Sequence, residues 1–343
     1  MAMLVPIVEL LAGAALVLMT LRDVFDTVVV PGGSRTSLHV ARRLLRVMLP
    51  LWRWLRPGKG ISTTFAPVLL VASFVTWAML MVLGFGMMCD ALGDRFDPPV
   101  RSLFEAIYLA GSSMVTLGPS NTVALGAGRW VILAAGFCGL GAITLAVTYL
   151  LEIQSSVSRR DVGIYKLNTS AGDPPSALTL LETYAVLGCE GEVPAILGQT
   201  RDWCTTVRQS HASHPSLIYF RSTGTGAGWP AALGALLDLS LIVSRLIDED
   251  HWRGPSLLLR AEGLRMSAEL ARLSRLEPAE DEASEEDVAE VRRRLGDAGY
   301  RLREDVDVSA MLRERRTNMA CVKAMADHLG KPCAPFLPPP SAA

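Results

Sequence analysis

Two long stretches without a charged side chain set the strongest limit on how this chain can fold. Residues 65–89 and 130–151 are uncharged and predominantly apolar. Each exceeds the roughly 20 residues that a helix needs, at about 1.5 Å rise per residue, to cross a hydrocarbon layer of about 30 Å. We therefore predict two membrane-spanning helices. Two buried helices of a large soluble domain are the alternative, although such helices seldom need uncharged runs of this length.

A third apolar segment lies at the N-terminus, and we predict residues 1–30 to form the first transmembrane helix. Charged side chains flank its uncharged centre, residues 10–21. No basic residue precedes the apolar part, as it would in a secretory signal peptide. Arg22 and Asp26 are spaced i,i+4, which places them to pair on one helix face. Alternatively, the helix ends near Leu21 and Arg22 marks the membrane interface.

The distribution of basic residues predicts the orientation of these spans. The connection formed by residues 31–64 contains no acidic residue, and its basic residues are Arg35, Arg42, Arg43, Arg46, Arg53, Arg56 and Lys59. Basic loops lie preferentially on the cytoplasmic side. Arg159 and Arg160, after the last span, place that end in the cytoplasm as well. We therefore expect a multi-pass protein of the plasma membrane, with the N-terminus and residues 90–129 outside.

Within the basic connection, residues 38–55 alternate apolar and arginine stripes at helical spacing. With Trp52 and Trp54 beside them, this pattern predicts a helix lying in the inner interface, which Pro50 should end or kink. Anionic lipid headgroups are the expected partner, at about 1 kcal/mol for each arginine near the surface. A solvated connector with snorkelling arginines is the alternative. Proximity to the membrane argues against nucleic acid as the partner.

The stretch from residue 102 to residue 121 combines a short helix with a glycine-containing loop. Ser102 and Glu105 stand three apart, the pattern that satisfies free amides at a helix start. The loop that follows reads Thr-Leu-Gly-Pro-Ser-Asn from Thr116 to Asn121. Membrane proteins keep non-helical backbone between spans where it lines a protein-walled or water-filled path. This arrangement resembles the pore loop of the two-helix, potassium-channel-like ion channel family, whose filter reads Thr-Val-Gly-Tyr-Gly-Asp.

The resemblance covers about residues 65–155 and implies a pore module of outer helix, pore helix, filter and inner helix. By it, the ion-conduction filter comprises Thr116, Leu117, Gly118, Pro119 and Ser120. Backbone carbonyls and a threonine hydroxyl there replace the water around a permeating monovalent cation, potassium in the family. Four loops must surround one axis, so the resemblance implies a homotetramer. It implies no cofactor.

Three departures from the family pattern fall in the outer half of this filter. Pro119 stands where the family has tyrosine, and proline has no amide hydrogen and a fixed φ. Ser120 replaces the second glycine, where a positive φ would strain a residue that has a Cβ. Asn121 replaces an acidic residue and so removes one negative charge from each subunit at the outer mouth. The resemblance therefore predicts cation conduction, but it does not predict which cation is preferred.

The last span carries small and hydroxyl side chains that fit two interpretations. Gly136, Gly139 and Gly141 lie about where the family has its gating glycine, and a bend there would open the cytoplasmic end. Close helix packing explains the same residues equally well. Thr144 and Thr148 are candidates for the cavity lining, or they bond back to their own helix.

Residues 156–331 carry helical apolar spacing without βαβ alternation, so we predict a helical cytoplasmic domain. Expected helices cover residues 177–186, 194–210, 230–246, 254–276 and 308–329, and Ser284 with Asp287 resembles a capping box. The glycine cluster 224–228 is interpreted as a turn, because no GxGxxG or Walker lysine is present. The six cysteines form no CxxC pair, and neither a disulfide framework nor a metal site is expected. The proline-rich tail, residues 332–343, is predicted to be disordered.

Together these features predict an all-α membrane protein with three transmembrane helices, a re-entrant pore helix with its filter loop, and a helical cytoplasmic domain. The expected function is a tetrameric cation channel that conducts ions passively. A non-conducting membrane sensor or scaffold that keeps the channel architecture is the main alternative. The sequence shows no catalytic triad, paired acids or HExxH motif, so an enzyme is not expected.

Overall fold

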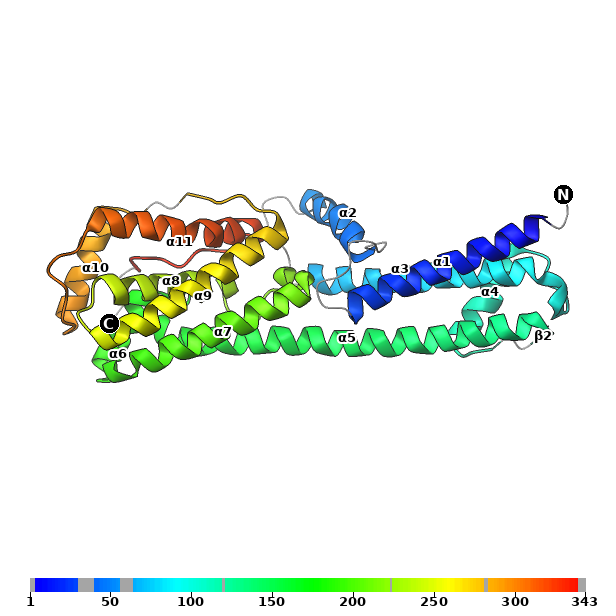
Figure 1. Ribbon diagram of the computed structural model, residues 1–343, viewed down its shortest axis with the longest axis horizontal. Coiled ribbons are helices and arrows are strands. Elements are labelled where there is room, and N and C mark those ends of the chain that lie inside the picture. Colours follow the sequence, from blue (N-terminus) through cyan, green and yellow to red (C-terminus); the bar gives the residue numbers. More distant parts are fainter. Residues whose placement is uncertain are drawn as a thin grey trace. The chain divides into compact units, whose positions relative to one another are not determined.

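The computed structural model describes residues 4–29, 40–55, 64–118, 121–222, 224–280 and 283–338. Most of these residues are helical (Figure 1). Three helices are long and apolar enough to cross a membrane, namely α1 (Leu4–Val28), α3 (Phe65–Ala91) and α5 (Ala127–Ala171). The prediction of a helical protein with three candidate membrane spans is therefore confirmed at this level.

The chain divides into two compact units. The first comprises residues 1–56 and 64–153, and the second comprises residues 57–63 and 154–343. The division falls inside α5, which continues as one helix well beyond the uncharged run 130–151. Charged side chains end the hydrophobic pattern after Leu151, but they do not end the helix.

In the first unit, α1 and α3 lie side by side (Figure 1) and touch through glycines. A Cβ atom on Gly13 would lie 2.5 Å from the carbonyl oxygen of Gly84, and one on Gly84 would lie 2.9 Å from the carbonyl oxygen of Gly13. Neither position has room for a larger side chain, because two backbones meet there. Small residues at a helix crossing allow this close approach.

The C-terminal part of α1 carries a buried acid that joins three helices. The Asp23 side chain is fully buried, and its Oδ2 accepts hydrogen bonds from Trp77 Nε1 on α3 at 2.8 Å and from the amide of Val40 at 3.1 Å. Val40 begins α2 (Val40–Leu55), so one carboxylate serves both α2 and α3. These bonds offset the cost of burying the carboxylate.

Two local predictions at these helices have different outcomes. Arg22 Nε lies 3.7 Å from Asp26 Oδ2, which confirms the i,i+4 pair, and α1 continues to Val28 rather than ending near Leu21. Of the two effects expected of Pro50, ending the helix or kinking it, the first is wrong, since α2 continues through Pro50 to Leu55. Pro50 is exposed, so the carbonyl that loses its helical partner can be solvated.

Between α3 and α5 the chain forms a short helix framed by a small β-ribbon. The elements are η1 (Gly93–Arg95), β1 (Phe96–Asp97), α4 (Leu103–Met114) and β2 (Val123–Ala124). The two strands pair antiparallel, with Phe96 opposite Ala124 and Asp97 opposite Val123. The sequence did not predict this ribbon. It brings the two ends of the α4 segment together beside the start of α5.

Where the structure describes it, the second unit is helical apart from its connections and one isolated bridge between Ile247 and Leu302. After the last part of α5 it contains α6 (Ala177–Val186), η2 (Glu190–Glu192), α7 (Val193–Ser213), η3 (Pro215–Tyr219), α8 (Gly228–Arg245), α9 (Asp250–Ser274), α10 (Glu285–Asp297) and α11 (Val308–Leu329). The predicted helices are therefore present, within a few residues at their ends. The Ser284–Asp287 capping box and the end of α11 at Gly330 are confirmed.

Helix α8 is the centre of this unit, because all of its residues except Arg245 are buried. Its Asp238 is paired with Arg315 of α11, through N–O distances of 2.9 and 3.0 Å. Both side chains are at most 4% exposed. Two parallel hydrogen bonds of this kind compensate the desolvation of both charges.

The proline-rich tail differs from the prediction of disorder over the part that the structure describes. Ala334 and Phe336 are buried, and the guanidinium carbon of Arg315 lies 4.4 Å from the centre of the Phe336 ring. A cation–π contact and burial of the ring hold residues 332–338 against the helices. Residues 339–343 lie outside the described residues.

Candidate functional site

Helix α4 begins with the side-chain cap that the sequence predicted. Ser102 Oγ accepts the amide of Glu105 at 3.3 Å, and Glu105 Oε2 accepts the amide of Arg101 at 3.0 Å. Both residues thereby satisfy amides at the start of the helix, which the helix itself leaves without partners. The carboxylate reaches one residue further back than in a standard capping box, to Arg101 instead of Ser102.

One side of α4 is held by α3, whereas the other is bare in the single chain. A Cβ atom on Gly86 of α3 would lie 2.7 Å from Ile107 Cγ1, so α4 contacts α3 directly there. Ala106, Leu109 and Ala110 are buried on the same helix. In contrast, Phe104 is 86% exposed and Tyr108 is 75% exposed. An aromatic surface of this kind requires lipid or protein to cover it.

The chain turns sharply after α4. The amides of Leu117 and Gly118 both point back to the carbonyl oxygen of Ser112, at 2.9 and 3.2 Å. Thr116 has φ 61° and Gly118 has φ 68°, so two residues of this turn are left-handed. Glycine tolerates this conformation, as predicted for Gly118, but it costs a β-branched residue such as Thr116 about 1–2 kcal/mol. Such strain is often found at functional sites.

Two features make the loop after α4 accessible to a ligand. Its side chains lie outward, with Val115 54% and Leu117 81% exposed. Within the described part of the chain, no backbone amide donates to the carbonyl oxygens of Thr116, Leu117 or Gly118. The predicted filter residues Pro119 and Ser120 lie outside the described residues. No described backbone amide therefore competes for these three carbonyl oxygens.

The end of α4 rests on the glycines of α5. Gly139 lies so close to the carbonyl group of Met114 that a Cβ atom there would overlap it, and a Cβ atom on Gly136 would lie 3.5 Å from the carbonyl oxygen of Ser113. Gly141 has no atom within 4 Å of that position. Packing therefore explains Gly139 directly. Helix α5 shows no interruption at any of the three glycines.

Both threonines of α5 bond back to their own helix. Thr144 Oγ1 donates to the carbonyl oxygen of Leu140 at 2.9 Å, and Thr148 Oγ1 donates to that of Thr144 at 3.0 Å. Their side chains are nevertheless exposed in the single chain. Thr144 belongs to an exposed stripe with helical 3–4 spacing whose other members are Leu133, Phe137, Leu140, Val147 and Leu151.

The β-ribbon beside α4 was missed by the sequence interpretation, although it fixes the loop ends. Arg129 Nε donates to the carbonyl oxygen of Ala124 at 3.0 Å, and Gly128 packs against the carbonyl oxygen of Arg95. Strands of two residues carry almost no hydrophobic periodicity, which is the usual strand signal. The aromatic Phe96 on one strand and the β-branched Val123 on the other were the only hint.

The donor set predicted for this loop consists of the backbone carbonyl oxygens of residues 116–118 and the Thr116 hydroxyl. Oxygen ligands of this kind suit hard cations, and the carbonyl end of α4 adds a partial negative charge. Among the described residues, no group of three or more His, Cys, Asp or Glu side chains is arranged to hold a metal ion. No family model, curated protein or solved structure matches the chain.

Proposed function

We propose that four copies of this chain form a passive cation channel in which the loop after α4 surrounds the conduction path. The observation that carries the proposal is the pairing of a short capped helix with a strained loop whose carbonyl oxygens have no backbone donor in the described chain. A dehydrated monovalent cation needs several such oxygens at once. One chain supplies only one loop, so a closed ring requires further copies.

The bare surface of the first unit supports assembly around an axis. Phe104 and Tyr108 of α4 are exposed, as is the stripe of α5 that contains Phe137 and Thr144. Four copies arranged around one axis would cover part of this surface with neighbouring chains and expose the rest to lipid. In this arrangement α3 would be the outer helix and α5 the inner, path-lining helix.

The orientation of the proposed channel follows from its basic residues. The arginines of residues 31–64 and the pair Arg159–Arg160 would lie in the cytoplasm, and the α4 loop would face outside. The expected location is the plasma membrane. The second unit would then be a cytoplasmic assembly or regulatory domain. Helix α2 would lie on the inner leaflet with its arginines toward anionic headgroups.

The proposed permeating ion is a monovalent cation, with potassium as the first candidate and weak discrimination between cations. Thr116 and Gly118 retain the residue types of a potassium filter, whereas Pro119, Ser120 and Asn121 do not. Replacing Pro119–Ser120 by Tyr–Gly should raise the potassium-to-sodium permeability ratio. An unchanged ratio would show that these two positions do not set selectivity.

A non-conducting sensor or scaffold is a second candidate, favoured by one specific observation. The amides of Leu117 and Gly118 share the carbonyl oxygen of Ser112, which makes the turn compact. A compact turn of this kind could seal the path instead of forming it. Conduction and scaffolding then differ in one measurable property, the flux of cations through the purified protein.

The proposal is tested by potassium flux from liposomes that contain the purified protein. Gly118→Ala should reduce the flux, because alanine at φ 68° strains the loop. Gly188→Ala is the matched control, since Gly188 also has a positive φ, 64°, and also has no atom within 4 Å of an added Cβ. Wild-type flux equal to that of empty liposomes contradicts the channel, and so do equal effects of the two variants.

A further inference from the structure

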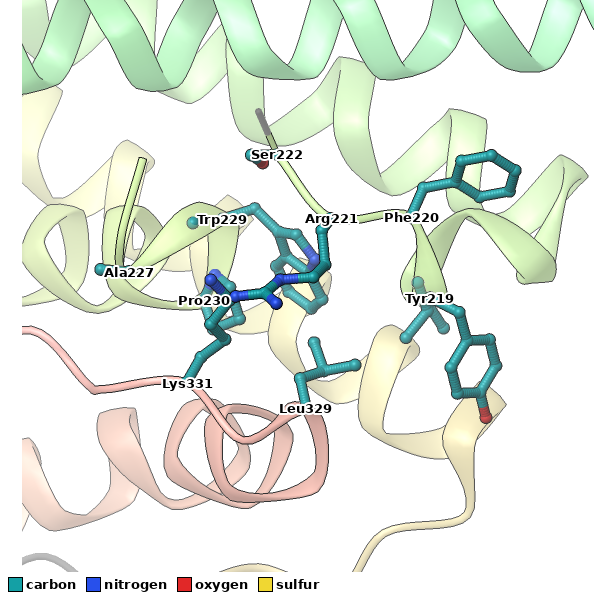
Figure 2. Close-up of a pocket in the computed structure, with 11 residues that line it drawn as sticks. Tyr219, Phe220, Arg221, Ser222, Ala227, Trp229, Pro230, Leu329 and Lys331 are labelled. Atoms are coloured by element: carbon teal, nitrogen blue, oxygen red, sulfur yellow. The ribbon is translucent and has the colours of Figure 1, made fainter. Parts of the chain in front are cut away.

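The second unit contains a pocket where three separate segments meet. Its walls are the end of η3 with the residues that follow it, the start of α8, and the end of α11 with Lys331 (Figure 2). The empty volume is about 300 Å³, part of it open to solvent. Trp229, Pro230 and Leu329 supply apolar contacts. Figure 2 shows the side chains of Arg221 and Lys331 extending toward this space from two different segments.

The two basic side chains lack a carboxylate partner in the pocket. Lys331 Nζ donates to the carbonyl oxygen of Gly226 at 2.6 Å, and neither Lys331 nor Arg221 forms an ion pair with any carboxylate of the described chain. Asp173 is close enough to act on Lys331. However, the Asp173 carboxylate already accepts the amides of Gly226 at 2.9 Å and of Ala227 at 3.4 Å.

The electrostatic balance of the pocket is therefore positive. Burial, and then the nearby Arg221 guanidinium, lower the pKa of Lys331, while Asp173 acts in the opposite direction. The N-terminus of α8 adds a partial positive charge to the same wall. Two like charges facing one pocket repel each other, and a bound anion would remove this repulsion.

Arg221 is held in place by a buried arginine of α5. The Arg160 side chain is 1% exposed, and it donates to the carbonyl oxygen of Phe220 at 2.8 Å and to Ser222 Oγ at 3.4 Å. These acceptors lie on either side of Arg221 in the chain. Arg160 is therefore a positioning residue, because it fixes the backbone from which Arg221 extends without lining the pocket itself.

We propose that this pocket binds a small phosphate-type oxyanion between Arg221 and Lys331, with the apolar wall contacting the rest of the ligand. The planar guanidinium fits two oxygens of such a group, and the ammonium supplies a second, point-like charge. Two positive side chains balance the charge of a dianion, whereas a carboxylate ligand would balance only one of them. The proposal concerns binding alone and does not depend on ion conduction.

Calorimetric titration of the full-length protein in detergent with inorganic phosphate, and then with pyrophosphate, tests this site. Arg221→Ala and Lys331→Met should each weaken binding at least about tenfold, because each removes a charge-assisted hydrogen bond. Arg221→Lys keeps the charge but loses the planar fork, so its affinity should be intermediate. Arg253→Ala is the control, since Arg253 is exposed on α9 and does not line the pocket.

The pH dependence of the same titration gives a second readout. Phosphate affinity should fall as the pH rises through the lowered pKa of Lys331, and Lys331→Met should remove this dependence. The thermal unfolding temperature of each variant shows whether it is folded. The proposal is overturned if the folded wild-type protein binds neither anion at millimolar concentration. Equal affinities of wild type and folded Arg221→Ala would overturn it as well.

Discussion

The contact between α4 and α5 leads to a prediction that compares two glycines of one helix. Gly139 faces the carbonyl group of Met114 so closely that a Cβ atom would overlap it, whereas Gly141 faces open space. We expect Gly139→Ala to destabilise the protein and Gly141→Ala to be tolerated. A hinge role for the glycine cluster would not distinguish the two positions in this way.

The expected difference in the free energy of unfolding follows from the surroundings of the two glycines. Each substitution replaces one helical glycine by alanine, so a helix-propensity gain of about 1 kcal/mol is common to both. Only Gly139→Ala adds overpacking against a backbone carbonyl, at about 1–3 kcal/mol. The free energies of unfolding of the two variants should therefore differ by about 1–3 kcal/mol, with Gly139→Ala the less stable.

Thermal unfolding of both purified variants in detergent measures this difference. For a protein unit of this size, about 1 kcal/mol corresponds to roughly 2–4 °C in Tm. The Tm of Gly139→Ala should thus lie roughly 2–12 °C below that of Gly141→Ala. Equal Tm values would refute the packing explanation. Unchanged stability with loss of ion flux in both variants would instead favour a hinge.

Three further predictions concern stability. Thr116→Gly should raise the free energy of unfolding by about 1 kcal/mol, because it relieves the left-handed strain, while reducing cation flux; a lower Tm would contradict this. Arg315→Met should cost about 3–5 kcal/mol in chemical denaturation, because it removes both charge-assisted hydrogen bonds from the buried Asp238 carboxylate, and adding Asp238→Leu should recover much of this loss. Burial lowers the pKa of His211 to about 3. The contribution of this buried neutral imidazole to the free energy of unfolding is therefore complete above about pH 6.5, and it should decrease by about 2 kcal/mol from pH 7 to pH 5. A His211→Asn variant whose Tm has the same pH profile as the wild type would contradict this.

Local signals in the sequence were sufficient for the membrane-length helices and their caps. The uncharged runs predicted α3 and the first part of α5, and the serine caps at Ser102 and Ser284 marked two helix starts. These features depend on residues within one or two helical turns of each other. The same is true of the Arg22–Asp26 pair.

Features that depend on distant residues were not predictable in this way. The bond from Trp77 to Asp23 joins residues 54 positions apart, and Arg315 meets Asp238 across 77 positions. The tail looked disordered because its composition is proline-rich, yet Phe336 is buried under Arg315. Tertiary contacts of this kind override local composition.

Only those features of the candidate site that depend on neighbouring residues were predictable. The cap of α4 and the left-handed Gly118 follow from local residue types. The positive φ of Thr116 was not predicted, because left-handed backbone is unusual for a β-branched residue. The contact of Gly139 with Met114 has no local signal either, because it depends on how α4 packs against α5. The pocket containing Arg221 and Lys331 joins segments that are far apart in the chain.

The number of chains in the native assembly tests the central claim most directly, because one loop per chain cannot enclose a path alone. Native mass spectrometry of the protein released from membranes or nanodiscs gives this number. Four chains of 37.0 kDa predict a particle of about 148 kDa. A particle that contains only one or two chains would contradict a shared conduction path.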